Sequence, residues 1–169
     1  MTEVIAVVIG AVIGFGLSLI LTVAQRNSDR RSTLSNLLLD WNGCARTCIY
    51  TKSPSEVDTL FVELQSLSDR ICVLGHDMVD CHRIKVLTSE LLNALYDWRP
   101  FVVNDKKIED ALAAGKVTTD FYFEYWGGEK RTKAWNEISL SVQRSASQVN
   151  EIASCVMQRD WISTSFSPE

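Results

Sequence analysis

The sequence predicts an all-α protein, in which an N-terminal single transmembrane helix continues into a cytoplasmic, up-down, four-helix-bundle-like domain. Residues 4–24 form an uncharged run of 21 residues. Four later segments carry apolar residues at alternating spacings of three and four, the period of a helix with one buried face. Capping and turn signals separate those segments. We therefore divide the chain into a transmembrane anchor at 1–24, a helical bundle at 25–162 and a flexible tail at 163–169.

The uncharged run is long enough to cross a bilayer, because 21 residues at about 1.5 Å each reach roughly 30 Å. One alternative is a cleaved signal peptide, which would begin with basic residues and have a shorter apolar core. The other alternative is a buried core helix. Arg26, Arg30 and Arg31 follow the run, and no Lys or Arg precedes it. By the positive-inside rule, these topology anchors place the N-terminus outside and the C-terminal domain in the cytoplasm, at an inner or plasma membrane.

Small or hydroxyl-bearing residues recur at every fourth position of the run. This small-residue ladder comprises Ala6, Gly10, Gly14, Ser18 and Thr22. Positions four apart lie on one face of a helix, and in lipid a flat face lets two helices approach closely. Glycine is also frequent in membrane helices that have no such role. We expect the ladder to be the membrane-helix interface, through which the anchor forms a homo-oligomer or binds another membrane helix.

The first cytoplasmic helix is expected to continue the anchor helix, because no proline lies between residues 4 and 50. Its apolar seam comprises Leu34, Leu37, Trp41, Cys44 and Cys48. A turn follows at 51–56. There Ser53 is the expected N-cap, Pro54 the first helical residue and Glu56 the partner that completes a capping box.

Three more long helices are expected after this turn. The seam of the second helix comprises Val57, Leu60, Leu64, Leu67, Ile71 and Leu74. The seam of the third comprises Ile84, Leu87, Leu91, Ala94 and Trp98. The seam of the last comprises Trp135, Ile138, Val142, Val149, Ile152 and Val156. Gly75 is expected to end the second helix, Pro100 to stop the third, and Ser145 to interrupt the last seam.

The connection between the third and last helices is less regular. Asn104 or Asp105 is expected to cap a separate short helix that Gly115 closes. Residues 117–126 alternate like a strand, but because they have no partner strand we expect a loop and a short helix. Their aromatic side chains either fill the end of the core or contact a partner or the membrane surface. The basic stretch 127–133 is expected to be a solvated helix start.

Helices with one apolar face and short connections bury those faces against one another. Because the first helix leads away from the membrane and the second returns, we expect the turn at Gly75 and His76 on the membrane side of the bundle. Residues 100–128 should then lie at the distal end. Trp161, Ile162 and Phe166 would lie near the lipid headgroups, where aromatic side chains are common.

Charge and cysteine content limit the classes of function. The net charge is −4, and because Glu3 is the only charge in residues 1–24, the rest of the chain carries 17 basic against 20 acidic residues. Nucleic-acid binding requires a basic stripe that this balance does not favour, so we expect no nucleic-acid partner. Five cysteines, an odd number, argue against a disulfide framework and indicate a reducing compartment.

One stretch, from Cys72 to His82, has the residue types of a metal site. Cys72 and His76 are four residues apart, and Cys81 follows across a turn, so the three form a candidate metal cluster. Buried thiols and a helix-capping histidine explain the same residues without a metal. No nucleophile elbow, phosphate-binding loop or dinucleotide motif occurs. We therefore expect no enzyme and no cofactor, with metal-dependent activity near His76 as the alternative.

These observations favour a single-pass, membrane-anchored helical protein that acts as a protein-interaction, scaffold or signalling module. Its anchor would self-associate, and its bundle would bind an unidentified cytoplasmic protein. The alternative is a membrane-disrupting or pore-forming effector gated by the bundle. Ser18 and Thr22 are the main polar groups of the run, which argues against a wide aqueous pore.

Overall fold

A computed structural model describes residues 2–126 and 128–158, with the backbone alone for 2–11, 122, 123 and 126. Each element of the described chain is helical, which confirms the all-α prediction. The elements are α1 (Thr2–Thr47), the 3-10 turn η1 (Cys48–Tyr50), α2 (Pro54–Leu74), α3 (Cys81–Ala113), α4 (Thr119–Trp126) and α5 (Glu129–Gln158). The expected headgroup residues Trp161, Ile162 and Phe166, and the tail 163–169, lie outside the described residues.

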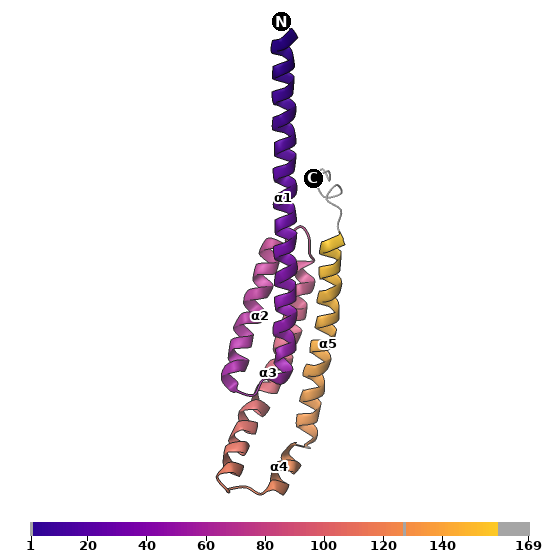
Figure 1. The fold of residues 1–169 in the computed structure, drawn as a ribbon. Coiled ribbons are helices and arrows are strands. Elements are labelled where there is room, and N and C mark those ends of the chain that lie inside the picture. The colour runs from indigo at the N-terminus through magenta and orange to yellow at the C-terminus, as the bar shows by residue number, and fades with distance from the viewer. Residues whose placement is uncertain (1, 127, 159–169) are drawn as a thin grey trace.

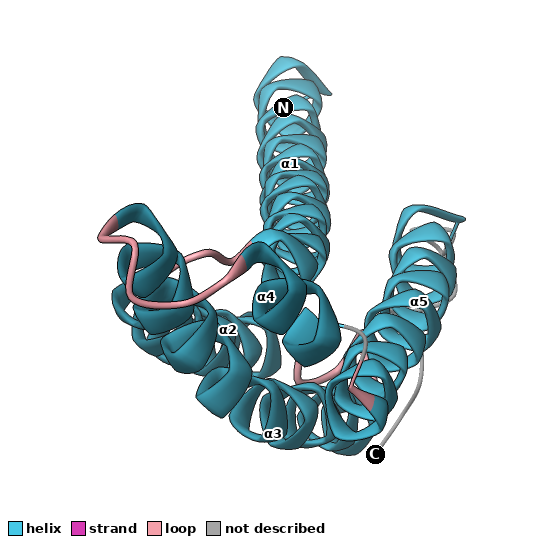
Figure 2. Cartoon of the chain, turned by 90° about the horizontal axis from the view of Figure 1, so that it is seen from below, coloured by secondary structure: helices cyan, strands magenta, loops and turns pink. Residues whose placement is uncertain are grey.

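The four long helices form an up-down bundle (Figures 1 and 2). Each helix packs against two neighbours, in the order α1, α2, α3, α5 and back to α1. The N-terminal half of α1 extends beyond one end of the bundle as a single helix. At the opposite end α3 and α5 extend past the end of α1, and α4 connects them (Figure 1). The prediction of a helical bundle is therefore confirmed.

The bundle core contains most of the apolar seams that the sequence predicts. Trp41 lies at its centre with no exposed surface, and its Nε1–H donates to Thr88 Oγ1 at 3.2 Å. The Thr88 hydroxyl in turn donates to the carbonyl oxygen of Ile84 at 2.8 Å. The seam of the last helix differs by one position, since Ala134 is buried while Trp135 is 37 % exposed.

The turn between α1 and α2 has the predicted capping box. Ser53 Oγ accepts from the backbone N–H of Glu56 at 3.3 Å, and the Glu56 carboxylate accepts from the N–H of Lys52 at 3.0 Å. The hydrogen bond from Lys52 is the main reason why the pKa of Glu56 lies below its ordinary value. Pro54 is the first helical residue of α2, as predicted.

Replacing the capping residue should lower stability measurably. We expect Ser53→Ala to lower the free energy of unfolding by about 1 kcal/mol, because the N–H of Glu56 then loses its acceptor. The exposed Ser66→Ala, within the same helix, is the control and should change stability by at most about 0.5 kcal/mol. Urea unfolding followed by circular dichroism measures both, and equal effects would contradict the capping role.

The predicted stop at Pro100 is wrong, because α3 continues through this residue to Ala113. A proline within a helix costs about 3 kcal/mol. Tertiary packing on both sides of Pro100 outweighs that cost: Trp98 and Val102 are almost fully buried. Arg99 further ties this part of α3 to α2, where its guanidinium contacts the Asp58 carboxylate at 2.9 and 3.0 Å.

The separate short helix expected after Pro100 is therefore absent from the described chain, and Asn104 and Asp105 lie inside α3 rather than at a cap. Gly115 does close the helix, with φ of 66° and a backbone N–H that donates to Leu112 O at 2.9 Å. The short helix expected within 117–126 is confirmed as α4.

The protruding part of α1 carries eight large apolar side chains that are 42 to 71 % exposed. They are Val12, Ile13, Phe15, Leu17, Leu19, Ile20, Leu21 and Val23. Among the residues that the structure describes, no helix is both long and apolar enough to cross a membrane. The described residues thus give no support to the predicted transmembrane helix.

Candidate functional site

The protruding half of α1 holds the described part of the small-residue ladder. Ala6 and Gly10 are described by their backbone alone, while Gly14, Ser18 and Thr22 are exposed. A Cβ added to Gly14 would meet no atom within 4 Å. Thr22 Oγ1 donates to the carbonyl oxygen of Ser18 at 2.8 Å, so this hydroxyl is satisfied within the helix itself.

Gly14, in the middle of the ladder, lies on the side of α1 that faces away from the bundle. Gly14 and Trp41 are 27 residues apart in one unbroken helix, which at 3.6 residues per turn is about seven and a half turns. Because Trp41 points into the core, Gly14 points in the opposite direction. The same outer face continues below the ladder through exposed positions, which are Gln25, Ser32, Asn36, Leu39 and Gly43. The bundle therefore leaves this face of α1 open along its length.

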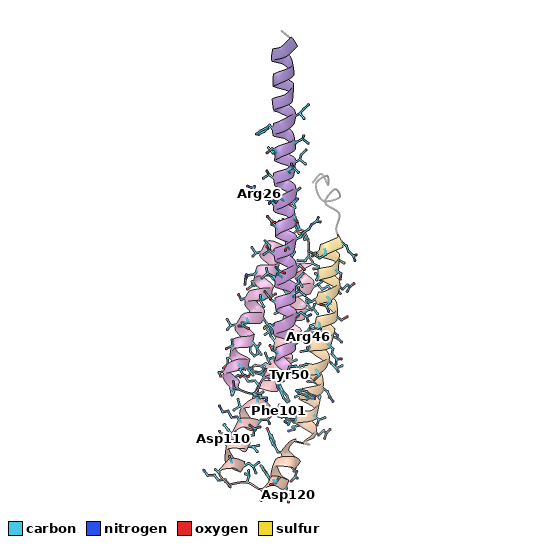
Figure 3. The ribbon with its side chains drawn as sticks, viewed as in Figure 1. Arg26, Arg46, Tyr50, Phe101, Asp110 and Asp120 are labelled. Carbon is cyan, nitrogen blue, oxygen red and sulfur yellow. The ribbon has the colours of Figure 1, made fainter. Side chains whose placement is uncertain are left out.

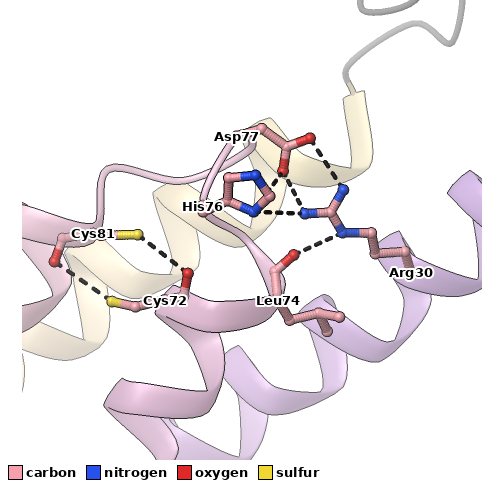
Figure 4. Close-up of polar contacts among 6 residues, drawn as sticks. All are labelled: Arg30, Cys72, Leu74, His76, Asp77 and Cys81. Carbon is pink, nitrogen blue, oxygen red and sulfur yellow. Dashed lines mark hydrogen bonds and ion pairs between the residues drawn. The ribbon is translucent and has the colours of Figure 1, made fainter.

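Arg30, one of the predicted topology anchors, joins α1 to the turn between α2 and α3 (Figure 4). Its Nε donates to the carbonyl oxygen of Leu74 at 2.7 Å, which caps the end of α2. Its two terminal nitrogens contact both carboxylate oxygens of Asp77, and Nη2 lies 3.2 Å from His76 Nδ1. We call this set of contacts the Arg30 clasp.

The Arg30 clasp changes the ionisation of Asp77. Burial acts to raise the pKa of Asp77, but hydrogen bonds from Arg30 and from the backbone, together with the charge of Arg30, outweigh it. The net pKa is therefore lowered. Arg26 lies higher on α1, above the bundle (Figure 3), and is exposed, whereas Arg31 is half-buried. The three predicted topology anchors thus lie where the protruding helix enters the bundle.

Close packing at Gly75 supports the turn that Arg30 holds. A Cβ at Gly75 would lie 2.9 Å from both Ile71 O and Val79 Cγ2, and 3.0 Å from Leu34 Cδ1. A Cβ at Gly43, by contrast, would meet no atom within 4 Å. The sequence predicted Gly75 as a helix end, but this crowding could be found only in three dimensions.

Replacing Gly75 and Gly43 by alanine should therefore have opposite effects on the stability of the bundle. We expect Gly75→Ala to lower the free energy of unfolding by about 1–3 kcal/mol through crowding. Gly43→Ala should raise it by about 0.5–1 kcal/mol, because alanine loses less entropy in a helix and fits without contact. Thermal and urea unfolding measure both variants. A neutral Gly75→Ala would mean that the turn is looser than the structure indicates.

The three candidate metal ligands do not come together. Cys72 and Cys81 lie against each other, while His76 points toward Arg30 and Asp77 (Figure 4). No group of three His, Cys, Asp or Glu residues with metal-binding geometry occurs among the described residues. Cys44 and Cys48 form a second pair, since Cys48 Sγ lies 3.6 Å from the carbonyl oxygen of Cys44, and Cys155 lies on α5. Burial is the main cause that raises the pKa values of Cys44 and Cys48 to about 12.

The distal end of the bundle contains an ion pair that sequence reasoning missed. Arg131 Nη2 lies 2.8 Å from Asp105 Oδ2, and the side chains are only 11 % and 13 % exposed. The Arg131 guanidinium also lies 5.1 Å from the centroid of the Trp98 ring, which stacks with Phe101. The expectation that 127–133 is solvated is therefore wrong for Arg131, because a partner 26 residues away buries it.

A hollow of about 370 Å³ lies beside this ion pair, between η1, α3 and α5. Tyr50, Trp98 and Trp135 line it together with Lys52 and Lys106. Figure 3 labels Tyr50 at the end of η1 and Phe101 just beyond it on α3. Two described side chains of the aromatic segment in α4 differ in their burial: Phe121 is 49 % exposed and Tyr125 is half-buried.

The described side chains form exposed helix faces, ion pairs between helices and the Arg30 clasp. Helical proteins pack against and bind one another through features of these kinds. The fold places the chain among all-α helical bundles with one protruding helix. No family model, curated protein or solved structure matches it.

Proposed function

We propose that the chain is a single-pass membrane protein whose helical bundle acts as a protein-interaction, scaffold or signalling module. One observation carries the proposal: eight large apolar side chains project from the part of α1 that extends beyond the bundle. At 100° per residue they point in directions all round the helix, and the ladder forms a narrow strip between them. A helix that is apolar all round is usually covered by a protein core or by lipid.

Lipid is the covering that we favour. The uncharged run includes residues 4–11, which extend the apolar surface to 21 residues in the sequence. An α-helix satisfies its own backbone in hydrocarbon, and the bond from Thr22 to the Ser18 carbonyl satisfies a hydroxyl there as well. Arg26, Arg30 and Arg31 favour an N-terminus outside and a bundle in the cytoplasm, at an inner or plasma membrane.

Self-association through the small-residue ladder fits this arrangement. Gly14, in the middle of the ladder, lies on the face of α1 opposite Trp41, so a second copy can approach the ladder there without meeting the bundle of the first. Close approach through small residues supplies the van der Waals contact that drives helix pairing in lipid. In such a pair the two bundles lie on the outer sides, where each is open to a cytoplasmic protein.

A pair of anchors would orient the attached bundles. α1 runs without a break from Thr2 to Thr47, and its buried seam begins at Leu34. The Arg30 clasp fixes the same helix to the turn between α2 and α3 just before that seam. A change in anchor packing would therefore reach the bundle as a rigid-body movement. This coupling is the reason for proposing a scaffold or signalling role.

Two glycines of the anchor provide a matched test. A Cβ at Gly14, on the ladder, or at Gly16, on the opposite face, would meet no atom within 4 Å, so neither substitution disturbs the isolated chain. We expect Gly14→Leu to weaken association in proteoliposomes at least about tenfold, equivalent to about 1.4 kcal/mol, and Gly16→Leu to leave it unchanged. Fluorescence energy transfer between labelled chains measures both.

The outcomes separate the parts of the proposal. If Gly14→Leu associates as the unsubstituted chain does while both remain in the membrane, the ladder is not the interface. If the proteoliposomes release an entrapped dye, and release stops when residues 1–24 are deleted, the pore-forming alternative is favoured over the scaffold.

A further inference from the structure

Two cysteines flank the turn between α2 and α3. Cys72 lies in the last turn of α2, and Cys81 is the first residue of α3. Cys72 Sγ lies 3.6 Å from the carbonyl oxygen of Cys81, and Cys81 Sγ lies 3.6 Å from the carbonyl oxygen of Cys72. The two side chains therefore face each other across the turn (Figure 4). Both are half-buried, so small reagents reach them.

We propose that Cys72 and Cys81 form a redox modification site, which closes to an intrachain disulfide when the folded protein meets a low-molecular-weight disulfide. Reciprocal contact of each thiol with the other residue's backbone brings the pair into the range of separation that a disulfide spans. Rotation of the two side chains then brings sulfur to sulfur. The contacts that support the pairing lie between α2 and α3 alone.

The two thiols have different parts in the reaction. Burial, followed by the hydrogen bond and charge of Cys81, raises the pKa of Cys72 to about 11, so Cys72 is mostly protonated at neutral pH. Cys81 is the first residue of α3, and the N-terminus of a helix is a place where cysteines commonly act as nucleophiles. We therefore assign the first attack to Cys81 and the second to Cys72.

In the first step the Cys81 thiolate attacks one sulfur of the small disulfide. An S–S bond forms to Cys81, and one equivalent of small thiolate leaves and takes up the proton that Cys81 released. In the second step the Cys72 sulfur attacks Cys81 Sγ, its proton passing to solvent, and the second small thiolate leaves. The two cysteines are oxidised by two electrons, and the small disulfide is reduced to two thiols.

The disulfide would close a ten-residue loop, 72–81, that includes His76 and Asp77 of the Arg30 clasp. Cross-linking a loop of this length restricts the unfolded chain. We expect oxidation to raise the Tm by about 5–10 °C. The disulfide would also restrain the turn that Arg30 contacts. The redox state of the two cysteines and the position of α1 would therefore be linked.

The full chain in detergent micelles, treated with oxidised glutathione under native conditions, tests the proposal. We expect peptide mapping to find a bond between Cys72 and Cys81, and a reductant to reverse both the bond and the Tm increase. Cys155→Ser, which removes an exposed cysteine elsewhere, is the matched control and should still form the bond.

Single variants test the order of attack. Cys72→Ser should accumulate a glutathione adduct on Cys81 and show no Tm increase on oxidation, whereas Cys81→Ser should form neither the bond nor a comparable adduct on Cys72. If mapping of the folded, unsubstituted chain finds both cysteines free after full oxidation, or joined to other cysteines, the proposal is overturned. That mapping requires no variant to fold.

Discussion

Deleting residues 1–24 should move the chain from the membrane fraction to the soluble fraction. The segment holds no charge after Glu3, and leucine, isoleucine, phenylalanine and valine at the centre of a membrane helix each favour insertion by about 0.3–0.6 kcal/mol. The buried seam of α1 begins at Leu34, so the deletion leaves the bundle core intact. Alkaline carbonate extraction and circular dichroism measure partition and folding.

Two arginine substitutions test whether the apolar character of residues 1–24, and not only their presence, holds the chain in the membrane. Leu17→Arg places a charge within the uncharged run and costs about 2.5–3.5 kcal/mol if that position lies near the bilayer centre. Asn36→Arg adds the same charge to an exposed position beside the bundle and should leave partition unchanged. A folded chain that stays in the pellet after deletion of 1–24 would contradict the proposed anchor.

Replacing Trp41 by alanine should destabilise the bundle by about 3–5 kcal/mol. The indole has no exposed surface, and its N–H is bonded to Thr88, so the substitution removes both a large packed ring and a link between α1 and α3. Because single domains are stable by only about 5–15 kcal/mol, this loss is a large part of the total.

Leu39→Ala is the matched control for Trp41→Ala. Leu39 is on the same helix but 55 % exposed on the outer face, so its truncation should change stability by at most about 0.5 kcal/mol. Urea unfolding gives both values from the shift in midpoint at constant slope. A loss below about 1 kcal/mol for Trp41→Ala would mean that α1 is not part of the core.

Local signals made much of the fold predictable from the sequence. Ser53, Pro54 and Glu56 act within one turn of helix, so their capping box needs no distant partner. The spacing of the apolar residues predicted the buried faces. A helix with one face in the core and the other in water carries apolar residues at regular spacings of three and four. The prediction that Trp135 belongs to the buried seam is wrong. A large aromatic residue next to a seam fits the apolar pattern, whereas the small Ala134, which is buried, contributes little to it.

Features that depend on distant residues were not predictable. Pro100 has a strong local tendency to end a helix, and distant contacts, namely the packing of Trp98 and Val102 and the ion pair of Arg99 with Asp58, outweigh it. The ion pair of Arg131 with Asp105 joins residues of different helices, and neither carries a motif. The Arg30 clasp likewise spans 47 residues of sequence between Arg30 and Asp77.

The small-residue ladder was visible in the sequence, but its direction was not. Only an unbroken α1 relates Gly14 to Trp41 and places Gly14 opposite the core. The three candidate metal ligands do not converge for a related reason. Cys72 and Cys81 lie together, as expected for residues that flank a turn, but His76 lies beside Arg30. His76 Nδ1 instead lies 3.2 Å from Nη2 of Arg30, which belongs to another helix.

Depth measurement along α1 in lipid bilayers tests most directly whether this helix passes from the bundle into the membrane. Nitroxide labels would be placed singly at Phe15, Leu19, Val23 and Asn36, all exposed, in a chain whose native cysteines are replaced by serine and whose folding is checked. We expect oxygen to reach Phe15 and Leu19 better than a water-soluble nickel chelate does, and the chelate to reach Asn36 freely. Equal access of the chelate to Phe15 and Asn36 would contradict a membrane-spanning α1.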